Sequence, residues 1–116
     1  MSDLQVKTKQ EGELGILAET GEVRTEIAFE HYAAARALGD EGAKHLLVYL
    51  GAEVFMDTAS LATLIRRDGE IKKAHGRLVL FSPSKAVRRV LEHCGLGVRF
   101  LVAEDEEAAR ALVAAV

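Results

Sequence analysis

The tetrad Asp57-Thr58-Ala59-Ser60 places one carboxylate and two hydroxyls side by side, groups that can cap a helix or, with a base, attack a substrate. The apolar run HLLVYLGAEVF before it has the branched and aromatic residues of a buried strand. Apolar residues recur after it at helical spacing: Leu61, Leu64 and Ile65. The tetrad therefore lies at a strand-to-helix turn, where Asp57, Thr58 or Ser60 can bond the unpaired amides of the first helical turn.

Catalysis by Thr58 or Ser60 needs a base, and the sequence assigns none. The four histidines fall on different predicted elements without a paired spacing: His31, His45, His75 and His93. Cys94 has no second thiol to complete a zinc site, and the glycines that follow it lead into neither a P-loop lysine nor a helix. We therefore expect no enzyme, no metal site and no cofactor.

Length and composition describe a single domain over residues 1–116. The formal net charge of −3 disfavours binding to nucleic acid. No apolar stretch resembles a signal peptide or reaches the ~18 residues of a membrane span, so we expect no direct membrane insertion. The single cysteine excludes a disulfide within the chain, which favours the reducing cytoplasm. The oligomeric state stays open between a monomer and a weak dimer.

The order of the predicted elements indicates the fold class. Alternating or continuous apolar residues predict strands at residues 4–9, 14–20, 45–50, 77–81 and 98–102. Helical spacing predicts helices over residues 25–39, 57–76, 82–96 and 103–116. Strands separated by single helices need crossover connections. The sequence therefore predicts an α/β fold: a mixed, mostly parallel sheet of about five strands with an N-terminal antiparallel hairpin, flanked by about four helices.

Several local features of the helices can also be predicted. Gly39 is expected to stop the first helix, and Ser82 to cap the third, with Pro83 at its first position. One apolar stripe is predicted for the third helix: Val87, Val90, Leu91 and Cys94. The basic pairs at residues 66–67, 72–73 and 88–89 alternate with acidic residues, which indicates a solvated face.

The run GAEVFMDTASLATLIRRDGEIKKAHGRLVLFSPSKAVRRVLEHCGL resembles the STAS domain of bacterial anti-sigma factor antagonists, whose hallmark reads roughly D-S-S-G-L-G at the start of a helix. Further similarities are GEV at residues 21–23, the GRLVL strand, the S-P-S opening of the next helix and the acidic, alanine-rich terminal helix. The resemblance covers most of the chain. It implies a mixed sheet flanked by helices, in agreement with the predicted element order.

The resemblance also implies a regulatory protein that docks onto a partner and turns over no substrate. Antagonists of this kind bind an anti-sigma factor that is also a serine kinase, and so free the sigma factor. Phosphorylation of a hallmark serine adds roughly −1.5 to −2 charges to the docked surface and separates the pair. The partner contacts implied for this chain are Glu22, Arg24, Asp57, Thr58, Ala59 and Ser60.

This chain departs from the hallmark at the position of the usual phosphoserine, which Ala59 occupies. Alanine cannot accept a phosphate. Thr58 keeps a hydroxyl directly after Asp57, where STAS proteins of stress-signalling complexes carry theirs, so Thr58 is the better acceptor candidate and Ser60 the second. Arg24 also replaces an acidic residue common after the G-E-L turn.

Two alternatives follow from the same residues. The pattern D-T-A-x-L-A is also similar to the small STAS subunit of bacterial lipid-transport ABC transporters, which contacts the ATPase subunit and needs no phosphorylation. The run SKAVRRVLEHCGL and the acidic terminal helix favour the antagonist branch over this one. An enzyme with Thr58 or Ser60 as nucleophile ranks last.

Overall fold

Five strands form the main sheet of this computed structural model, which describes residues 5–20, 22–23, 28–50, 55–56, 58–93, 95 and 100–114. The spatial order is β1-β2-β4-β6-β7. The strands are β1 (Gln5–Glu11), β2 (Leu14–Thr20), β4 (His45–Leu50), β6 (Leu78–Phe81) and β7 (Leu101–Ala103). The strand predicted over residues 98–102 begins at Leu101 within the described residues.

The main sheet is parallel except at one edge. β1 and β2 form the predicted antiparallel hairpin, which turns at Gly12 with φ at 59°, while β2, β4, β6 and β7 pair in parallel. The carboxyl ends of these parallel strands therefore meet at one end of the sheet. The predicted fold class is confirmed.

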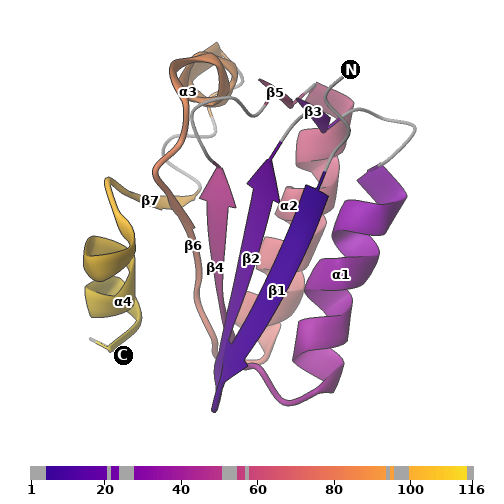
Figure 1. Cartoon of the computed structure of the whole chain (residues 1–116), viewed down its shortest axis with the longest axis vertical. Coiled ribbons are helices and arrows are strands. Elements are labelled where there is room, and N and C mark those ends of the chain that lie inside the picture. Colours follow the sequence, from indigo (N-terminus) through magenta and orange to yellow (C-terminus); the bar gives the residue numbers. More distant parts are fainter. Residues whose placement is uncertain are drawn as a thin grey trace.

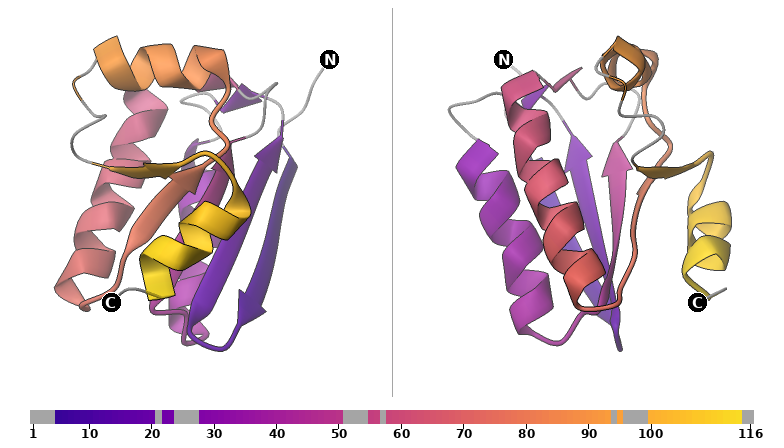
Figure 2. Two further views of the ribbon diagram at one scale, coloured as in Figure 1. Left: turned by 90° about the vertical axis from the view of Figure 1, so that its left-hand side faces the viewer. Right: turned by 180° about the vertical axis from the view of Figure 1, so that it is seen from behind.

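Helices cover both faces of the sheet and its carboxyl end (Figure 1, Figure 2). The described residues form four helices: α1 (Ala28–Asp40), α2 (Thr58–Lys73), α3 (Lys85–His93) and α4 (Glu106–Ala114). The first two pack side by side on one face and α4 lies on the other, while α3 crosses the carboxyl end. This arrangement gives the domain a core on each side of the sheet.

Alternation along the central strands divides the buried side chains between the two cores. Leu17, Val48 and Leu80 face α1 and α2, where Leu61 and Leu64 of α2 meet them. The preceding residue in each strand faces the other way and packs under α4 with Ala109: Ile16, Leu47 and Val79. Because the central strands are apolar on both faces, they read as continuous apolar runs in the sequence.

A second, two-stranded sheet lies at the carboxyl end of the first. It pairs β3 (Glu22–Val23) with β5 (Phe55–Met56) in parallel, and β5 leads directly toward α2. In Figure 1 this small sheet lies beside α3 and the start of α2. Sequence alternation over two residues is too short to predict such a pair.

The expectation that Gly39 stops the first helix is wrong. Helix α1 continues through Asp40, and the left-handed residue that ends it is Gly42, with φ at 101°. The Gly42 amide donates to the Gly39 carbonyl and the Ala43 amide to the Leu38 carbonyl, which is a Schellman motif. Gly39 instead faces α2, where a Cβ at this position would collide with the Arg67 guanidinium.

The predicted opening of α3 is also wrong, by two residues. Ser84 caps the helix, because its Oγ accepts the Val87 amide at 3.2 Å, and Lys85 is the first helical residue. Ser82 has φ at 51°, and its Oγ donates to the Glu104 carbonyl at 3.0 Å. Ser82 is therefore engaged in joining β6 to the segment after β7, and its neighbour Pro83 precedes the cap.

Helix α3 buries the predicted apolar stripe as far as the structure describes it. Val87 and Leu91 are buried, and Val90 packs against the same core. Cys94, the last residue of the predicted stripe, lies outside the described residues.

The burial of Leu91 generates a test of how α3 is placed. Leu91 is 3% exposed, so Leu91→Ala should lower the free energy of unfolding by about 2–4 kcal/mol through the cavity it leaves. The control is Arg89→Ala on the exposed side of the same helix, expected within about 0.5 kcal/mol of the parent. Urea denaturation of both variants measures the difference. A loss below about 0.5 kcal/mol for Leu91→Ala would show that this face of α3 does not anchor the helix.

Candidate functional site

The tetrad predicted from the sequence lies where β5 ends and α2 begins. Residues 58–60 form the first turn of α2, and Asp57 lies outside the described residues. At this position the first amide groups of α2 have no partner within the helix, and the helix dipole is positive. The strand-to-helix turn predicted from the sequence is therefore present, with Thr58 as the first helical residue.

Pairing between β3 and β5 brings a distant segment to the same place. Glu22 pairs with Phe55 and Val23 with Met56, so the backbone at Glu22 lies beside the strand that runs into Thr58. Arg24, the other residue predicted in this turn, lies outside the described residues. Two segments more than 30 residues apart thus share one end of the domain (Figure 1).

The residues that follow the tetrad hold α2 to the sheet. Leu61 and Leu64, one turn and two turns into the helix, are 1% and 0% exposed, and Ile71 is buried further along. This spacing keeps one side of α2 in the core along most of its length. The first turn of α2 is therefore fixed by packing behind it.

Glu70 joins α1 to α2 through a cluster of polar contacts. The Tyr32 hydroxyl donates to Glu70 Oε2 at 2.7 Å, and Arg67 Nη1 donates to Oε1 at 3.3 Å. Arg36 from α1 forms an ion pair with the same carboxylate at 3.5 Å, and Arg66 forms another at 4.0 Å. The Arg66 guanidinium also lies over the Tyr32 ring, 4.9 Å from its centroid.

The solvated face predicted for residues 66–73 is therefore wrong in part. The Arg67 side chain is only 12% exposed, and its Nε is buried without a hydrogen-bond partner among the described residues. Asp68 is 1% exposed and forms an ion pair with Lys72 at 3.0 Å. Arg67 pairs with Glu70 and lies against Gly39 of α1, and Asp68 pairs with Lys72, contacts that charge alternation alone does not reveal.

The contacts of Glu70 set its charge state. Burial alone raises the pKa of the Glu70 carboxyl, but the hydrogen bonds from Tyr32 and Arg67 and the nearby charge of Arg36 outweigh burial. The pKa of Glu70 is therefore lower in the folded chain than its ordinary value. Because the carboxylate is the favoured form, Glu70 stays ionised and compensates the largely buried Arg67 guanidinium.

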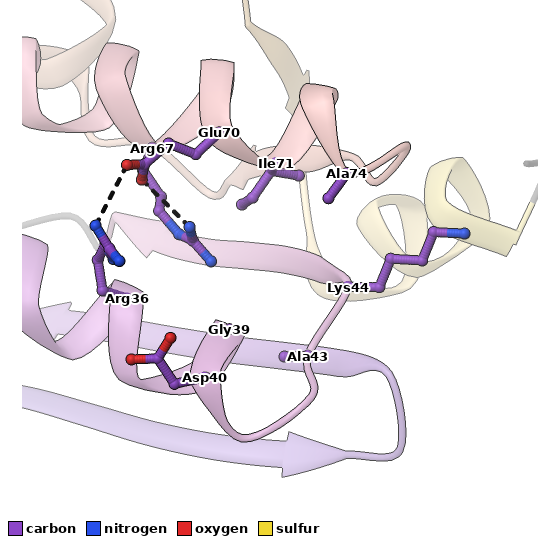
Figure 3. Close-up of a pocket in the computed structure, with 9 residues that line it drawn as sticks. All are labelled: Arg36, Gly39, Asp40, Ala43, Lys44, Arg67, Glu70, Ile71 and Ala74. Atoms are coloured by element: carbon purple, nitrogen blue, oxygen red, sulfur yellow. Dashed lines mark hydrogen bonds and ion pairs between the residues drawn. The ribbon is translucent and has the colours of Figure 1, made fainter.

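A pocket of about 360 Å³ lies between the second halves of α1 and α2 (Figure 3). Five charged residues line it, and small or apolar residues line the rest: Arg36, Asp40, Lys44, Arg67 and Glu70, with Gly39, Ala43, Ile71 and Ala74. Arg36 and Arg67 both point toward Glu70 and already pair with it. None of the site residues predicted from the sequence lines this pocket.

The described residues offer no metal-binding arrangement. Within the part of the chain that the structure describes, no group of three His, Cys, Asp or Glu side chains could hold a metal ion. Across the same residues, no helix combines the length and the apolar composition needed to cross a membrane. What the site offers is a helix start beside a short parallel strand pair, held rigidly by α2.

Comparison with known proteins adds an independent line of evidence. The family model of the STAS domain matches residues 5–109. A curated relative, the anti-sigma F factor antagonist of Lysinibacillus sphaericus, is 33% identical over 54 residues, which cover 47% of this chain and 46% of that protein. The matched stretch thus spans about half the length of the curated relative.

Solved structures show the same fold at low sequence identity. The anti-sigma factor antagonist SpoIIAA in its unphosphorylated form has a TM-score of 0.79 at 22% identity, over 98% of both chains. An anti-sigma factor antagonist from Mycobacterium paratuberculosis has a TM-score of 0.84 at 19% identity, over 96% of this chain and 94% of that one. The architecture extends over nearly the whole of each chain.

The Glu70 cluster generates a pH-dependent prediction. At pH 7, Glu70→Gln should lower the free energy of unfolding by about 1–2 kcal/mol, because Arg67 loses its compensating charge. The pKa of Glu70 is depressed by folding, so its contribution is full above the ordinary carboxyl pKa and disappears as the pH falls through the folded value. The gap between parent and variant should therefore shrink from pH 7 to pH 3.

The matched control is Glu92→Gln on α3, because Glu92 is exposed and forms no ion pair with a described residue. This variant should track the parent at every pH. Denaturant melts across the pH range measure all three proteins. A Glu70→Gln gap that stays constant from pH 7 to pH 3 would contradict the ionised-carboxylate role of Glu70.

Proposed function

Because the chain belongs to the STAS domain family, we propose that it acts as an anti-sigma factor antagonist: it binds an anti-sigma factor that is also a serine kinase, and so frees the sigma factor. The observation that carries this proposal is the strand-to-helix turn at Thr58, where the family hallmark falls beside the Glu22 strand. The curated relative and the similar solved structures are themselves anti-sigma factor antagonists. We place this activity in the cytoplasm, with no cofactor bound to the chain.

The docking surface in this proposal is built around the start of α2. Thr58, Ala59 and Ser60 form its centre with Asp57, and Glu22 and Arg24 contribute from the neighbouring segment. The burial of Leu61 and Leu64 behind this turn supports a rigid surface, since a preorganised surface loses less entropy when it docks. The chain supplies the surface and the partner supplies the bound ATP.

Phosphorylation would act on this surface through charge. The Bacillus antagonist SpoIIAA has been solved in a phosphorylated form, and its fold matches this chain with a TM-score of 0.70. Ala59 cannot accept a phosphate here, so Thr58 is the proposed acceptor and Ser60 the second candidate. A phosphate at a helix start is itself favourable by ~0.3–1 kcal/mol, so it should leave the domain folded. The two proteins must then separate because the phosphate would lose its water and be repelled by the partner's surface in the complex.

The second candidate function is the STAS subunit of a lipid-transport ABC transporter, and the sequence D-T-A-S-L-A is what favours it. That function would use the same turn to contact an ATPase subunit. A charge at Thr58 would weaken either complex, so the identity of the partner distinguishes the two. Binding to a transporter ATPase, with none to an anti-sigma factor kinase, would replace the antagonist proposal.

One prediction of the proposed function separates partner binding from the stability of the domain. Thr58→Glu should unfold within about 1 kcal/mol of the parent, because a negative charge suits a helix start. Its affinity for an anti-sigma factor kinase from the same genome should fall at least about tenfold, equivalent to ~1.4 kcal/mol, through the charge in the interface. Calorimetric titration and denaturant melts measure the two quantities.

Thr58→Val is the matched control, since valine keeps the shape of threonine and adds no charge. It should bind within a few-fold of the parent. Parent-like affinity of Thr58→Glu for a kinase that the parent binds would remove Thr58 from the interface and leave it as a helix-start residue only.

The second prediction restores the family's phosphoserine. Ala59→Ser should gain a phosphate at residue 59 when incubated with the kinase and ATP, because it supplies a hydroxyl at the hallmark position. Ala62→Ser, on the exposed side of the next turn of α2, is the control and should gain none. Mass spectrometry with site mapping reads both. Equal labelling at residues 59 and 62 would show that the kinase does not recognise the turn.

A further inference from the structure

Helix α3 exposes a row of cations on its outer side. Lys85, Arg88 and Arg89 are spaced at i, i+3 and i+4, which places them on one face of the helix, and all three are exposed. The face also carries one exposed carboxylate, Glu92. Val87 and Leu91 occupy the opposite, buried side. The outer face of α3 is therefore positive on a chain whose formal net charge is −3.

The arginines of α3 differ from those elsewhere in the described chain. The other described arginines each contact a carboxylate or a carbonyl: Arg36, Arg66, Arg67, Arg77 and Arg110. For the side chains of Arg88 and Arg89 the described residues provide neither an ion pair nor a hydrogen bond. The fold thus uses the first set for internal contacts and leaves the guanidinium groups of Arg88 and Arg89 available in solvent.

The position of α3 relates this face to the proposed docking surface. Helix α3 packs against β5, the short strand that leads into Thr58. Figure 1 and both views of Figure 2 show α3 crossing the same end of the domain where α2 begins. A partner large enough to cover the start of α2 therefore meets α3 as well.

We propose that the outer face of α3 extends the docking surface and binds an acidic patch on the same protein partner, an inference that rests on the proposed function. The guanidinium group of an arginine can donate two parallel hydrogen bonds to one carboxylate. Exposed charges at the rim of an interface mainly raise the rate of association. Because the chain as a whole is negative, it repels an acidic partner from most directions, and the cations of α3 attract that partner to this face.

The chemistry favours a protein partner over nucleic acid. Protein–DNA complexes commonly neutralise about 6–10 phosphates, whereas α3 offers three cations with a carboxylate among them. A carboxylate within the row suits a mixed protein surface, where a lysine or arginine of the partner can pair with Glu92. It opposes a uniformly negative surface such as a phosphate backbone or an anionic membrane.

The test compares two double charge reversals. Arg88→Glu/Arg89→Glu removes the row, and Lys44→Glu/Lys73→Glu makes the same change in net charge just before β4 and at the end of α2. Lys44 and Lys73 form no ion pair with described residues, and both lie at the end of the sheet opposite to the start of α2, since Lys44 precedes β4 and Lys73 ends α2. Stopped-flow association with the anti-sigma factor kinase is the measurement, and melting curves verify that both variants fold.

Association of Arg88→Glu/Arg89→Glu should be slower than that of the parent by about tenfold near 50 mM salt, and the gap should narrow near 500 mM salt, where screening is strong. The control pair should change the rate by less than about threefold, since its charges lie outside the proposed interface. Equal effects of both reversals would show a net-charge effect and overturn the assignment to α3.

Other outcomes distinguish this inference from the proposed function. If the parent binds the kinase and Thr58→Glu weakens it, but the α3 reversal binds like the parent, only the α3 inference fails. If the parent binds no anti-sigma factor kinase, the proposed function fails and the α3 inference with it. Binding of the parent to duplex DNA or to vesicles of anionic lipid, lost in the α3 reversal alone, would assign the row to that partner and overturn the inference.

Discussion

Parallel pairing of β2, β4 and β6 is the constraint on which the arrangement of this domain depends. A parallel strand can be followed by its neighbour only after the chain crosses back over the sheet, so helices must start where strands end. Both α2 and α3 therefore begin at the carboxyl end of the sheet, and the β3–β5 pair forms there too. The hallmark turn and the cationic row share one end of the molecule as a result of topology.

The Glu70 cluster fixes α1 against α2 near the other end of the two helices. The Glu70 carboxylate accepts a hydrogen bond from the Tyr32 hydroxyl and forms ion pairs with three arginines, two of them from α2 and one from α1. A single exposed ion pair contributes little to the free energy of unfolding. A network around a half-buried carboxylate contributes more and holds the two helices in one geometry. The cluster lies well along α2 from Thr58, so changes at the turn leave it intact.

The sequence was sufficient for the elements whose signals are local. Strand 45–50 was predicted to the residue, and Val87 and Leu91 were placed correctly in the core by helical spacing alone. The errors came from contacts made across the fold. Serine is a residue type common at helix caps, but Ser82 donates a hydrogen bond to the Glu104 carbonyl. Glycine is common where helices end, but Gly39 leaves space for the Arg67 side chain. Neither partner is near in sequence, so no local pattern could identify it.

The site shows the same division. The strand-to-helix turn at Thr58 could be predicted, because a strand-like apolar run ends before it and apolar residues at helical spacing begin after it. The parallel pairing of Glu22 with Phe55 could not be derived from spacing, because it involves two strands of two residues each. The burial of Arg67 and Asp68 was missed because charge patterning reports only on neighbours along the helix.

The ion pair between Glu11 and Arg110 joins the first described strand to the last described helix, across 99 residues of sequence. The face of the sheet formed by Ile16, Leu47 and Val79 is covered only when α4 docks beside that pair. During synthesis on the ribosome, β2, β4 and β6 emerge well before α4 does. The nascent chain therefore carries an uncovered apolar sheet face until α4 has left the exit tunnel and docked, and this exposed face makes the unfinished fold prone to aggregation.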